Sequence, residues 1–197
     1  IRWFTTQPGY VFHPMNAREE GDRIVAEVCL YDAAPLFPLA DGRPGSRSGA
    51  RLTRWEFDLT GATDVVRETA IDDLDSEFPR LDERFAGLPY RHGYYAADTT
   101  GAKSVKMNAI AHIDLKTGVR KVCNFDPGDQ VSEPVFIPRS ASAAEGEGWL
   151  TAVVWRAAEN RSDLVVLDAG DIDRGPVAVA RVPRRVPFGF HGNWVGA

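Results

Sequence analysis

The sequence predicts an all-β protein. Its short strands could build a sandwich, a barrel or several blades of a β-propeller, and propeller blades account best for their spacing. Short runs rich in Val, Ile, Phe and Trp recur along the 197 residues, separated by clusters of Gly, Pro, Asn and Asp, which is typical of antiparallel sheets. Three runs end alike, with an Asp followed by a turn glycine: Gly61, Gly118 and Gly170. These glycines lie 57 and 52 positions apart, near the propeller repeat of roughly 40–50 residues.

Eleven short strands are expected in chain order, and few segments look helical. Arg23 to Tyr31 and Leu52 to Leu59 alternate with the two-residue period of a strand. Asp114 to Gly118 is the clearest hairpin turn, and Ala157 to Ser162 is a second. The expected strands are Tyr10 to His13, Arg23 to Tyr31, Leu52 to Leu59, Val65 to Asp72, Tyr94 to Ala97, Ala109 to Asp114, Val119 to Asn124, Ser132 to Ile137, Trp149 to Arg156, Ser162 to Asp168 and Val177 to Val182.

The amino-acid composition argues against several classes of protein, including nucleic-acid-binding and membrane-spanning proteins. A hydrophobic fraction of 44% can fill a core, and a net charge of −5 argues against a nucleic-acid partner. The longest apolar runs, such as Trp149 to Trp155, are far shorter than the ~20 residues of a membrane span. Cys29 and Cys123 are the only two cysteines, lie 94 positions apart and have no CxxC spacing, which argues against a disulfide framework and against a thiolate metal site, so a reducing cytoplasm is expected.

Both ends of the sequence suggest a larger protein. Ile1 to Phe4 contains no initiator Met and reads as the middle of a strand. Phe188 to Trp194 is rich in aromatic residues and glycine, and such a segment is expected to pack rather than fray. We therefore expect residues 1–197 to be the C-terminal part of a single domain whose N-terminal part, on the same polypeptide, is missing.

Two of the four histidines are candidates for metal binding. His13 and His191 are flanked by apolar or small residues, and each is followed by an Asn two or three positions later. A neutral imidazole binds Fe(II) or Zn(II) well when a carboxylate orients its other N–H. The spacing of His13 and His191 does not decide whether each is a metal ligand or a buried core histidine, so both interpretations stay open. His92 and His112 have charged and aromatic neighbours or precede a hairpin, and both are interpreted as structural.

Two glutamates could provide such carboxylates. Glu77 and Glu133 each follow a Ser and precede an apolar segment. Burying a carboxylate is costly unless it is paired, so each either faces water or caps a turn, or it orients a cation or an imidazole. The sequence contains no nucleophile elbow, phosphate-binding loop or dinucleotide-binding glycine motif, which leaves hydrolase and nucleotide-binding functions without support.

Four segments, taken in order, resemble the carotenoid cleavage oxygenase family, which includes the bacterial lignostilbene dioxygenases. The resemblance spans the whole chain, and the ordered set is more specific than any one motif. The segments are Phe12 to Ala17 with Glu20 to Asp22, Ser76 to Arg80 with Gly87 to Tyr90, Ser132 to Pro138, and Val186 to Trp194.

The resemblance implies a seven-bladed β-propeller with one Fe(2+) on its axis, held by four histidines of which glutamates orient three. His13 resembles the third iron ligand and His191 the fourth. Glu77 is expected to orient His13, and Glu133 to orient His191. The first two histidines and the remaining glutamate are expected upstream. His92 and His112 fall outside the matching motifs.

The implied reaction inserts both atoms of O₂ across a conjugated C=C bond of a small apolar alkene and yields two carbonyl products. Arg51 to Trp55 and the Asn193-Trp194 ending resemble the lignostilbene branch, which favours a stilbenoid substrate. Apocarotenoid or carotenoid cleavage, isomerisation or ester cleavage, and a non-catalytic β-propeller binding module are the alternatives. Phe37, in the apolar loop Pro35 to Leu39, either lines the substrate tunnel or packs on its own blade. Homodimer formation and membrane association stay open.

Overall fold

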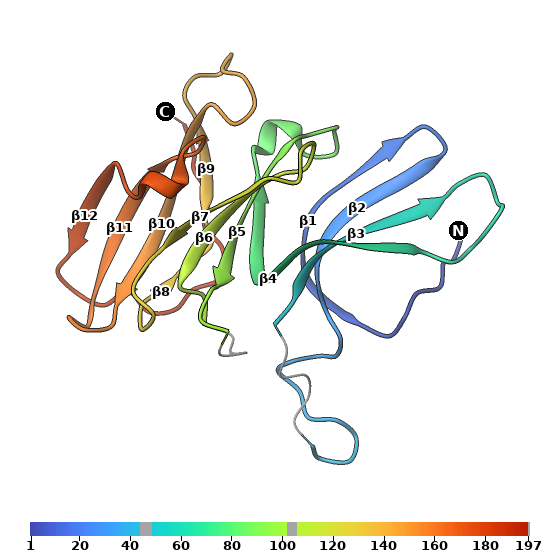
Figure 1. Ribbon diagram of the computed structural model, residues 1–197, viewed down its shortest axis with the longest axis horizontal. Helices are drawn as coiled ribbons and strands as arrows, with labels where there is room; N and C mark the ends of the chain where they lie inside the picture. The colour runs from blue at the N-terminus through green and yellow to red at the C-terminus, as the bar shows by residue number, and fades with distance from the viewer. Residues whose placement is uncertain (44–48, 102–105, 197) are drawn as a thin grey trace.

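The computed structural model describes residues 1–43, 49–101 and 106–196, and this part of the chain is almost entirely β-structure. Helix is limited there to two single 3-10 turns, η1 (Glu83–Phe85) and η2 (Ile172–Arg174). Within these residues, no helix has the length and apolar character required to cross a membrane. Figure 1 shows the strands in three adjacent groups, with β1–β3 at one end of the molecule and β10–β12 at the other.

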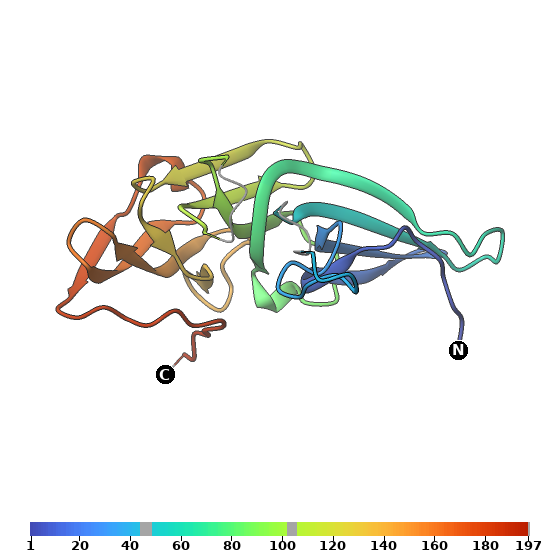
Figure 2. The ribbon, with the colours of Figure 1, turned by 90° about the horizontal axis from the view of Figure 1, so that it is seen from below.

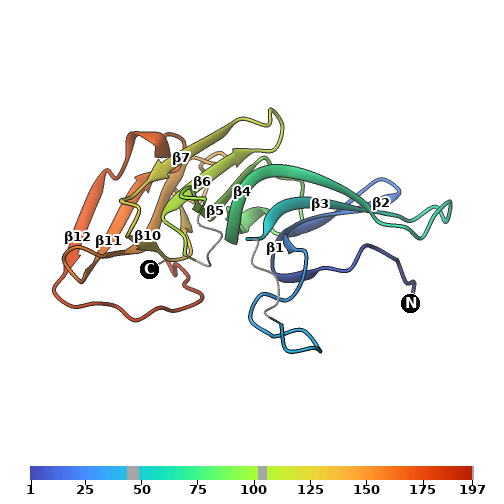
Figure 3. The same cartoon turned by 60° about the horizontal axis from the view of Figure 1, so that its bottom comes forward.

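Seven strands form one antiparallel sheet in which sequence order and spatial order agree. Its strand β4 pairs with β3 through residues 67–70 and, after a register shift, through Asp75, and it pairs with β5 through residues 75–81; Figure 3 shows β4 curving between these neighbours. A single strand is therefore the outermost strand of one blade and the innermost strand of the next. The strands are β1 (Tyr10–Glu20), β2 (Arg23–Tyr31), β3 (Arg51–Asp58), β4 (Arg67–Leu81), β5 (His92–Asp98), β6 (Ala109–Asp114) and β7 (Arg120–Asn124).

The remaining five strands form a third blade. Both β8 and β9 pair with β10, at different points along it, and together they act as one interrupted innermost strand. After β12 the chain continues without further strands, and Figure 2 shows this tail returning towards the middle of the molecule. The strands are β8 (Gln130–Val131), β9 (Val135–Pro138), β10 (Gly148–Arg156), β11 (Arg161–Asp168) and β12 (Ala178–Val182).

The middle blade is buried on both faces. Because successive side chains of a strand point to opposite faces, Tyr94 and Tyr95 of β5 enter different cores, and both are fully buried. Tyr94 packs with Leu150 of β10, whereas Tyr95 packs with Leu52 of β3. Blades packed face to face in this way are the arrangement expected of a propeller.

Ten of the eleven predicted strands are found at the expected places, and two of them extend well beyond the expected residues. The expected strand Ser132 to Ile137 is instead divided into β8 and β9, with residues 132–134 outside both. Arg23 to Tyr31 is a strand over the predicted residues, and the Asp114 to Gly118 turn closes through a 2.7 Å bond from the Gly118 amide to the Asp114 carbonyl. However, β1 continues to Glu20 and β4 continues to Leu81. Each contains a proline at an irregularity in its pairing, and the strand resumes beyond it.

Candidate metal centre

Three of the four candidate residues lie where an innermost strand is irregular. His13 lies in β1 where the pairing register shifts between Val11 and Asn16. Glu77 precedes a register shift in β4, and Glu133 lies in the break between β8 and β9. A proline follows each of them within two residues: Pro14, Pro79 and Pro134. Proline has no amide hydrogen to donate to a neighbouring strand, so regular pairing is interrupted at each of these residues. Such irregularities change the direction in which the adjacent side chains point.

The first pair joins the innermost strands of two successive blades. Nδ1 of His13 donates to Oε2 of Glu77 over 2.6 Å, and the same oxygen accepts from the Phe78 amide over 2.9 Å. Glu77 is buried at 5% exposure, and the His13 side chain is 22% exposed. A carboxylate only accepts, so the proton resides on Nδ1 and Nε2 keeps its lone pair for a ligand.

The second pair joins the C-terminal tail to the third blade. Nδ1 of His191 donates to Oε1 of Glu133 over 3.1 Å, and Oε2 accepts from the Gly192 amide over 2.9 Å. Nη1 of Arg80 also lies 2.9 Å from Oε2. Glu133 is buried, whereas the His191 side chain is 57% exposed. The two hydrogen-bonded His–Glu pairs are the pairs expected from the sequence, and each carboxylate also accepts a backbone amide.

The two pairs meet although their histidines lie near opposite ends of the chain. The rings of His13 and His191 have centroids 4.9 Å apart and planes at 77°. Two imidazoles that share a metal at about 2.1 Å from each Nε2, in neighbouring positions near a right angle, would have centroids about 4.6–5 Å apart. Imidazole nitrogens suit iron, zinc and copper, so the pair fits a transition metal. Among residues 1–43, 49–101 and 106–196, no cluster of three or more His, Cys, Asp or Glu is placed to hold a metal.

Phe78 separates the two histidines from the core. Its ring centroid lies 5.0 Å from that of His13 and 6.1 Å from that of His191. Its backbone has φ of +52°, a left-handed conformation that is strained for an aromatic residue. Strain of this kind is concentrated at functional sites, where the surrounding structure holds it in place. The sequence analysis assigned Phe78 no role.

Behind Glu77 lies a buried layer that the sequence analysis also missed. Burial and, to a smaller extent, the nearby Glu77 carboxylate raise the pKa of Tyr31 far above its usual range, and the same two causes raise the pKa of Cys29. Both side chains therefore stay protonated beside the carboxylate. Oε1 of Glu77 is buried and has no hydrogen-bond partner within the described residues.

His92 and His112 form a separate pair. Nδ1 of His92 lies 2.9 Å from Nε2 of His112, and the His112 ring stacks on Tyr94. Burial is the main cause that lowers the pKa of both histidines, to about 4 for His112, so the pair is neutral near pH 7. Neither ring contacts His13 or His191 in the described structure.

Two further cavities differ in character. An apolar groove of about 850 Å³ lies beside His191 and Glu133 and is lined by Phe78, Phe188 and Phe190 among others. Phe37 does not line it and lies 59% exposed in a loop.

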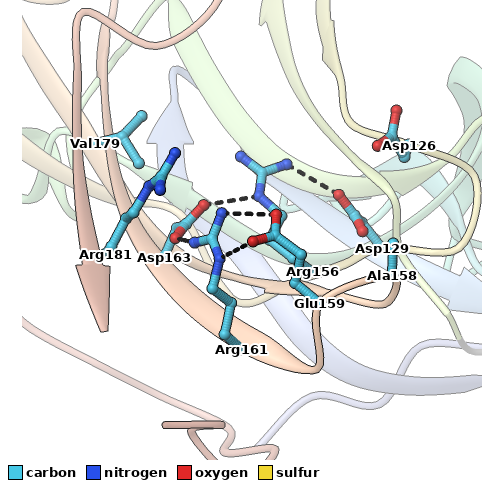
Figure 4. A pocket seen from close by; sticks show the side chains of 9 residues that line it. All are labelled: Asp126, Asp129, Arg156, Ala158, Glu159, Arg161, Asp163, Val179 and Arg181. Atoms are coloured by element: carbon cyan, nitrogen blue, oxygen red, sulfur yellow. Dashed lines mark hydrogen bonds and ion pairs between the residues drawn. The ribbon is translucent and has the colours of Figure 1, made fainter. Parts of the chain in front are cut away.

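A polar cavity, shown in Figure 4, contains Arg156 paired with two carboxylates, Asp129 and Asp163. Its charges largely compensate one another, as in an ion-pair network that stabilises the third blade.

Comparison with known proteins places these features in context. A family profile described as "Retinal pigment epithelial membrane protein" matches residues 1–196. The chain is 38% identical to a lignostilbene-α,β-dioxygenase isozyme of Sphingomonas paucimobilis, covering 100% of this chain, and 37% identical to an isoeugenol monooxygenase of Pseudomonas nitroreducens, covering 99%. It spans 43% of the length of each. The crystal structure of a Pseudomonas brassicacearum lignostilbene dioxygenase superposes with a TM-score of 0.91 at 35% identity, covering 100% of this chain and 44% of that one.

Proposed function

The chain belongs to the carotenoid cleavage oxygenase family, and from this membership we propose that the complete protein is a non-haem iron(II) dioxygenase that cleaves a conjugated C=C bond. Members of this family are metal-dependent oxygenases with a seven-bladed propeller fold. The observation that carries the proposal is the meeting of two His–Glu pairs from opposite ends of the chain, with ring centroids 4.9 Å apart.

In the proposed site, each residue of this chain has a defined task. His13 and His191 present Nε2 to the iron, while Glu77 and Glu133 accept the Nδ1 protons and keep both rings in that tautomer. The Glu77 carboxylate partly balances the charge of a ferrous ion, whereas the charge of Glu133 is offset by Arg80. When bound, iron supplies the redox chemistry that lets O₂ react with an alkene. Phe78 and the apolar groove exclude water and favour an apolar substrate.

The reaction needs no reductant. One C=C bond breaks, both oxygen atoms of O₂ enter the products, and each alkene carbon becomes a carbonyl carbon. We favour a stilbenoid substrate because a relative and a solved structure, at 38% and 35% identity, carry the name lignostilbene dioxygenase. Apocarotenoid cleavage by the same chemistry is the second candidate, since an apocarotenoid oxygenase of Synechocystis is 32% identical.

The remaining parts of the site are proposed to come from the rest of the same polypeptide. By the family pattern, these are two more histidines, a third glutamate and the other blades. The exposed aromatic side chains at both ends of the chain, Trp3, Phe188, Phe190 and Trp194, offer a surface for those blades. Two free buried cysteines fit a cytoplasmic location.

Metal analysis and product analysis of the complete protein test the function. Purified protein is analysed for iron and then given a 4-hydroxystilbene under ¹⁸O₂. We expect about one iron per chain and two aldehydes that each carry ¹⁸O. If the iron-loaded protein cleaves an apocarotenoid but not the stilbene, the substrate is an apocarotenoid, the second candidate. Protein without iron would overturn the oxygenase proposal and leave a β-propeller that binds.

A further inference from the structure

We propose that Arg80 is a positioning residue that fastens the C-terminal tail, and with it His191, onto the metal centre. The inference rests on the proposed function in one respect, namely that His191 is an iron ligand. Arg80 lies near the end of β4, on the innermost strand of the middle blade. The residues that it fastens belong to the third blade and to the tail.

A single guanidinium group joins three segments. Nη1 of Arg80 lies 2.9 Å from Oε2 of Glu133 and donates to the Gly192 carbonyl over 3.0 Å, while Nη2 pairs with Glu83 of η1. The Arg80 side chain is only 13% exposed. Gly192 adjoins His191, so the carbonyl contact fixes the backbone next to the ligand. Hydrogen bonds between charged groups and from a charged donor are the stronger ones in proteins.

The tail is held by ring contacts of Phe188 with Trp155 and of His191 with His13 and Phe78, and by few hydrogen bonds. Within the described part of the chain, four hydrogen bonds join residues 186–196 to the rest of the protein. One connects Val186 to Ser162, five residues before the ligand. The other three involve Glu133 or Arg80. Removing Arg80 would deprive the buried Glu133 of its cation and the Gly192 carbonyl of its donor, which frees the segment that carries His191.

Arg84 provides a matched control. It also connects the middle blade to the third blade, because its Nη1 donates to the carbonyls of Ala141 and Ala143 over 3.0 and 2.9 Å. It pairs with Asp82 and contacts neither Glu133 nor residues 186–196. A general loss of contact between blades would therefore affect Arg84 variants as well, whereas a loss of tail fastening would not.

The test uses the complete iron-loaded protein and two readouts other than activity. Release of ferrous iron to a chelator is timed, and hydrogen exchange is followed for peptides covering residues 186–194. We expect Arg80→Gln to speed iron release about 10-fold or more and to raise exchange in the tail. Arg80→Lys, which keeps the charge but not the branched geometry, should show a smaller change. Arg84→Gln should alter neither quantity by more than about 2-fold.

A double-mutant cycle tests whether Arg80 acts through Glu133. If it does, most of the effect of Arg80→Gln on iron release disappears when Glu133→Gln is already present, and Arg84→Gln stays additive. Equal changes in the Arg80 and Arg84 variants, or full additivity with Glu133→Gln, would overturn the role of Arg80. If the wild-type protein binds no iron, the proposed function is overturned. The role of Arg80 in fastening the tail can still be tested in that case, because unchanged hydrogen exchange of residues 186–194 in Arg80→Gln would overturn it.

Discussion

The two halves of the candidate metal centre reach the same geometry by different means. His13 and Glu77 come from β1 and β4, two strands of one sheet; their contact is 2.6 Å long, and their side chains are 22% and 6% exposed. His191 lies in a tail without strand pairing, its side chain is 57% exposed, and its contact with Glu133 is longer, at 3.1 Å. One half is thus held by the sheet and the other by a few polar contacts.

The carboxylates differ in the same way. Glu77 lies near two neutral groups, the protonated side chains of Tyr31 and Cys29. Glu133 is paired with the cation of Arg80. An imidazole on a paired strand needs only a hydrogen-bond acceptor to orient it, whereas an imidazole on a backbone without strand pairing also needs its backbone fixed. The comparison therefore predicts that equivalent substitutions in the two halves will have unequal effects.

Replacing either histidine should produce the largest effect. In the complete protein, His13→Ala and His191→Ala should each lose most of the bound iron, because each removes a proposed ligand. Their stabilities should differ. His13→Ala leaves the buried Glu77 with the Phe78 amide as its only backbone donor among the described residues, at a cost of about 1–3 kcal/mol, whereas in His191→Ala the buried Glu133 keeps Arg80 and the Gly192 amide, so this variant should stay within about 0.5 kcal/mol of the wild type. Metal analysis and thermal unfolding of the iron-free proteins measure both. Full iron in either variant would contradict the assignment of that ligand.

Replacing the glutamates should have the next largest effect. Glu77→Gln and Glu133→Gln should weaken iron binding about 10- to 100-fold, measured by competition with a chelator. We expect the greater loss of iron affinity for Glu77→Gln. The bond from His13 to Glu77 is the shorter of the two, and no cation comparable to Arg80 among the described residues helps to hold this half of the site. Glu145→Gln is the control, since Glu145 accepts from the amides of Arg91 and His92 away from the site. An equal loss in the Glu145 variant would point to general destabilisation.

Removing one hydroxyl behind Glu77 should have a smaller effect. Tyr31→Phe deletes a protonated hydroxyl beside the carboxylate, worth about 0.5–1 kcal/mol, and should weaken iron binding about 2- to 5-fold. Tyr95→Phe is the matched control, because that buried hydroxyl donates to Asp72 instead. If both variants bind iron equally, the layer behind Glu77 does not contribute to the site.

The smallest effect on iron is expected at the separate histidine pair. His92→Ala and His112→Ala should retain the wild-type iron content, since neither ring contacts His13 or His191 in the described structure. Loss of iron in either variant would show that the ligands have been assigned to the wrong histidines.

The same pair should instead affect stability in acid. The pKa of His112 falls from 6.5 to about 4 in the folded protein, so between these values the unfolded chain binds a proton that the folded chain does not. Stability is therefore complete above pH 6.5 and declines as the pH falls towards 4, by at most about 1.4 kcal/mol per pH unit. Unfolding measured across this range should show a shallower decline in His112→Gln. An unchanged slope would contradict the low pKa.

Much of the fold could be predicted because its signals are local. Alternation in Arg23–Tyr31 and the turn ending at Gly118 each depend on residues close in sequence, and both are observed. The ends of β1 and β4 were missed: the first strand was ended at His13, directly before Pro14, and the fourth at Asp72, before the acidic stretch that leads to Pro79. Only the register of the neighbouring strands shows that each proline lies at a bulge inside a continuing strand.

Only those site residues that lie in recognisable family motifs could be predicted from the sequence. His13, His191 and the two glutamates stand in segments that resemble a known family, and the structure brings both expected pairs together. Arg80 stands in one of those segments, but its partner Glu133 lies on another sheet, and nothing local distinguishes this arginine from other arginines. Tyr31 was missed for the same reason, since its contact with Glu77 depends on packing between strands.

The prolines beside the site have a consequence for association. β1 and β9 lie at edges of their sheets, and such edges are places where another strand can add and start aggregation. Pro14 and Pro138 lie within these edge strands, and Pro134 directly precedes β9. Because proline offers no amide hydrogen, strand addition is interrupted there. The residues that turn the ligands towards the metal also protect the incompletely assembled protein from self-association along its innermost edges.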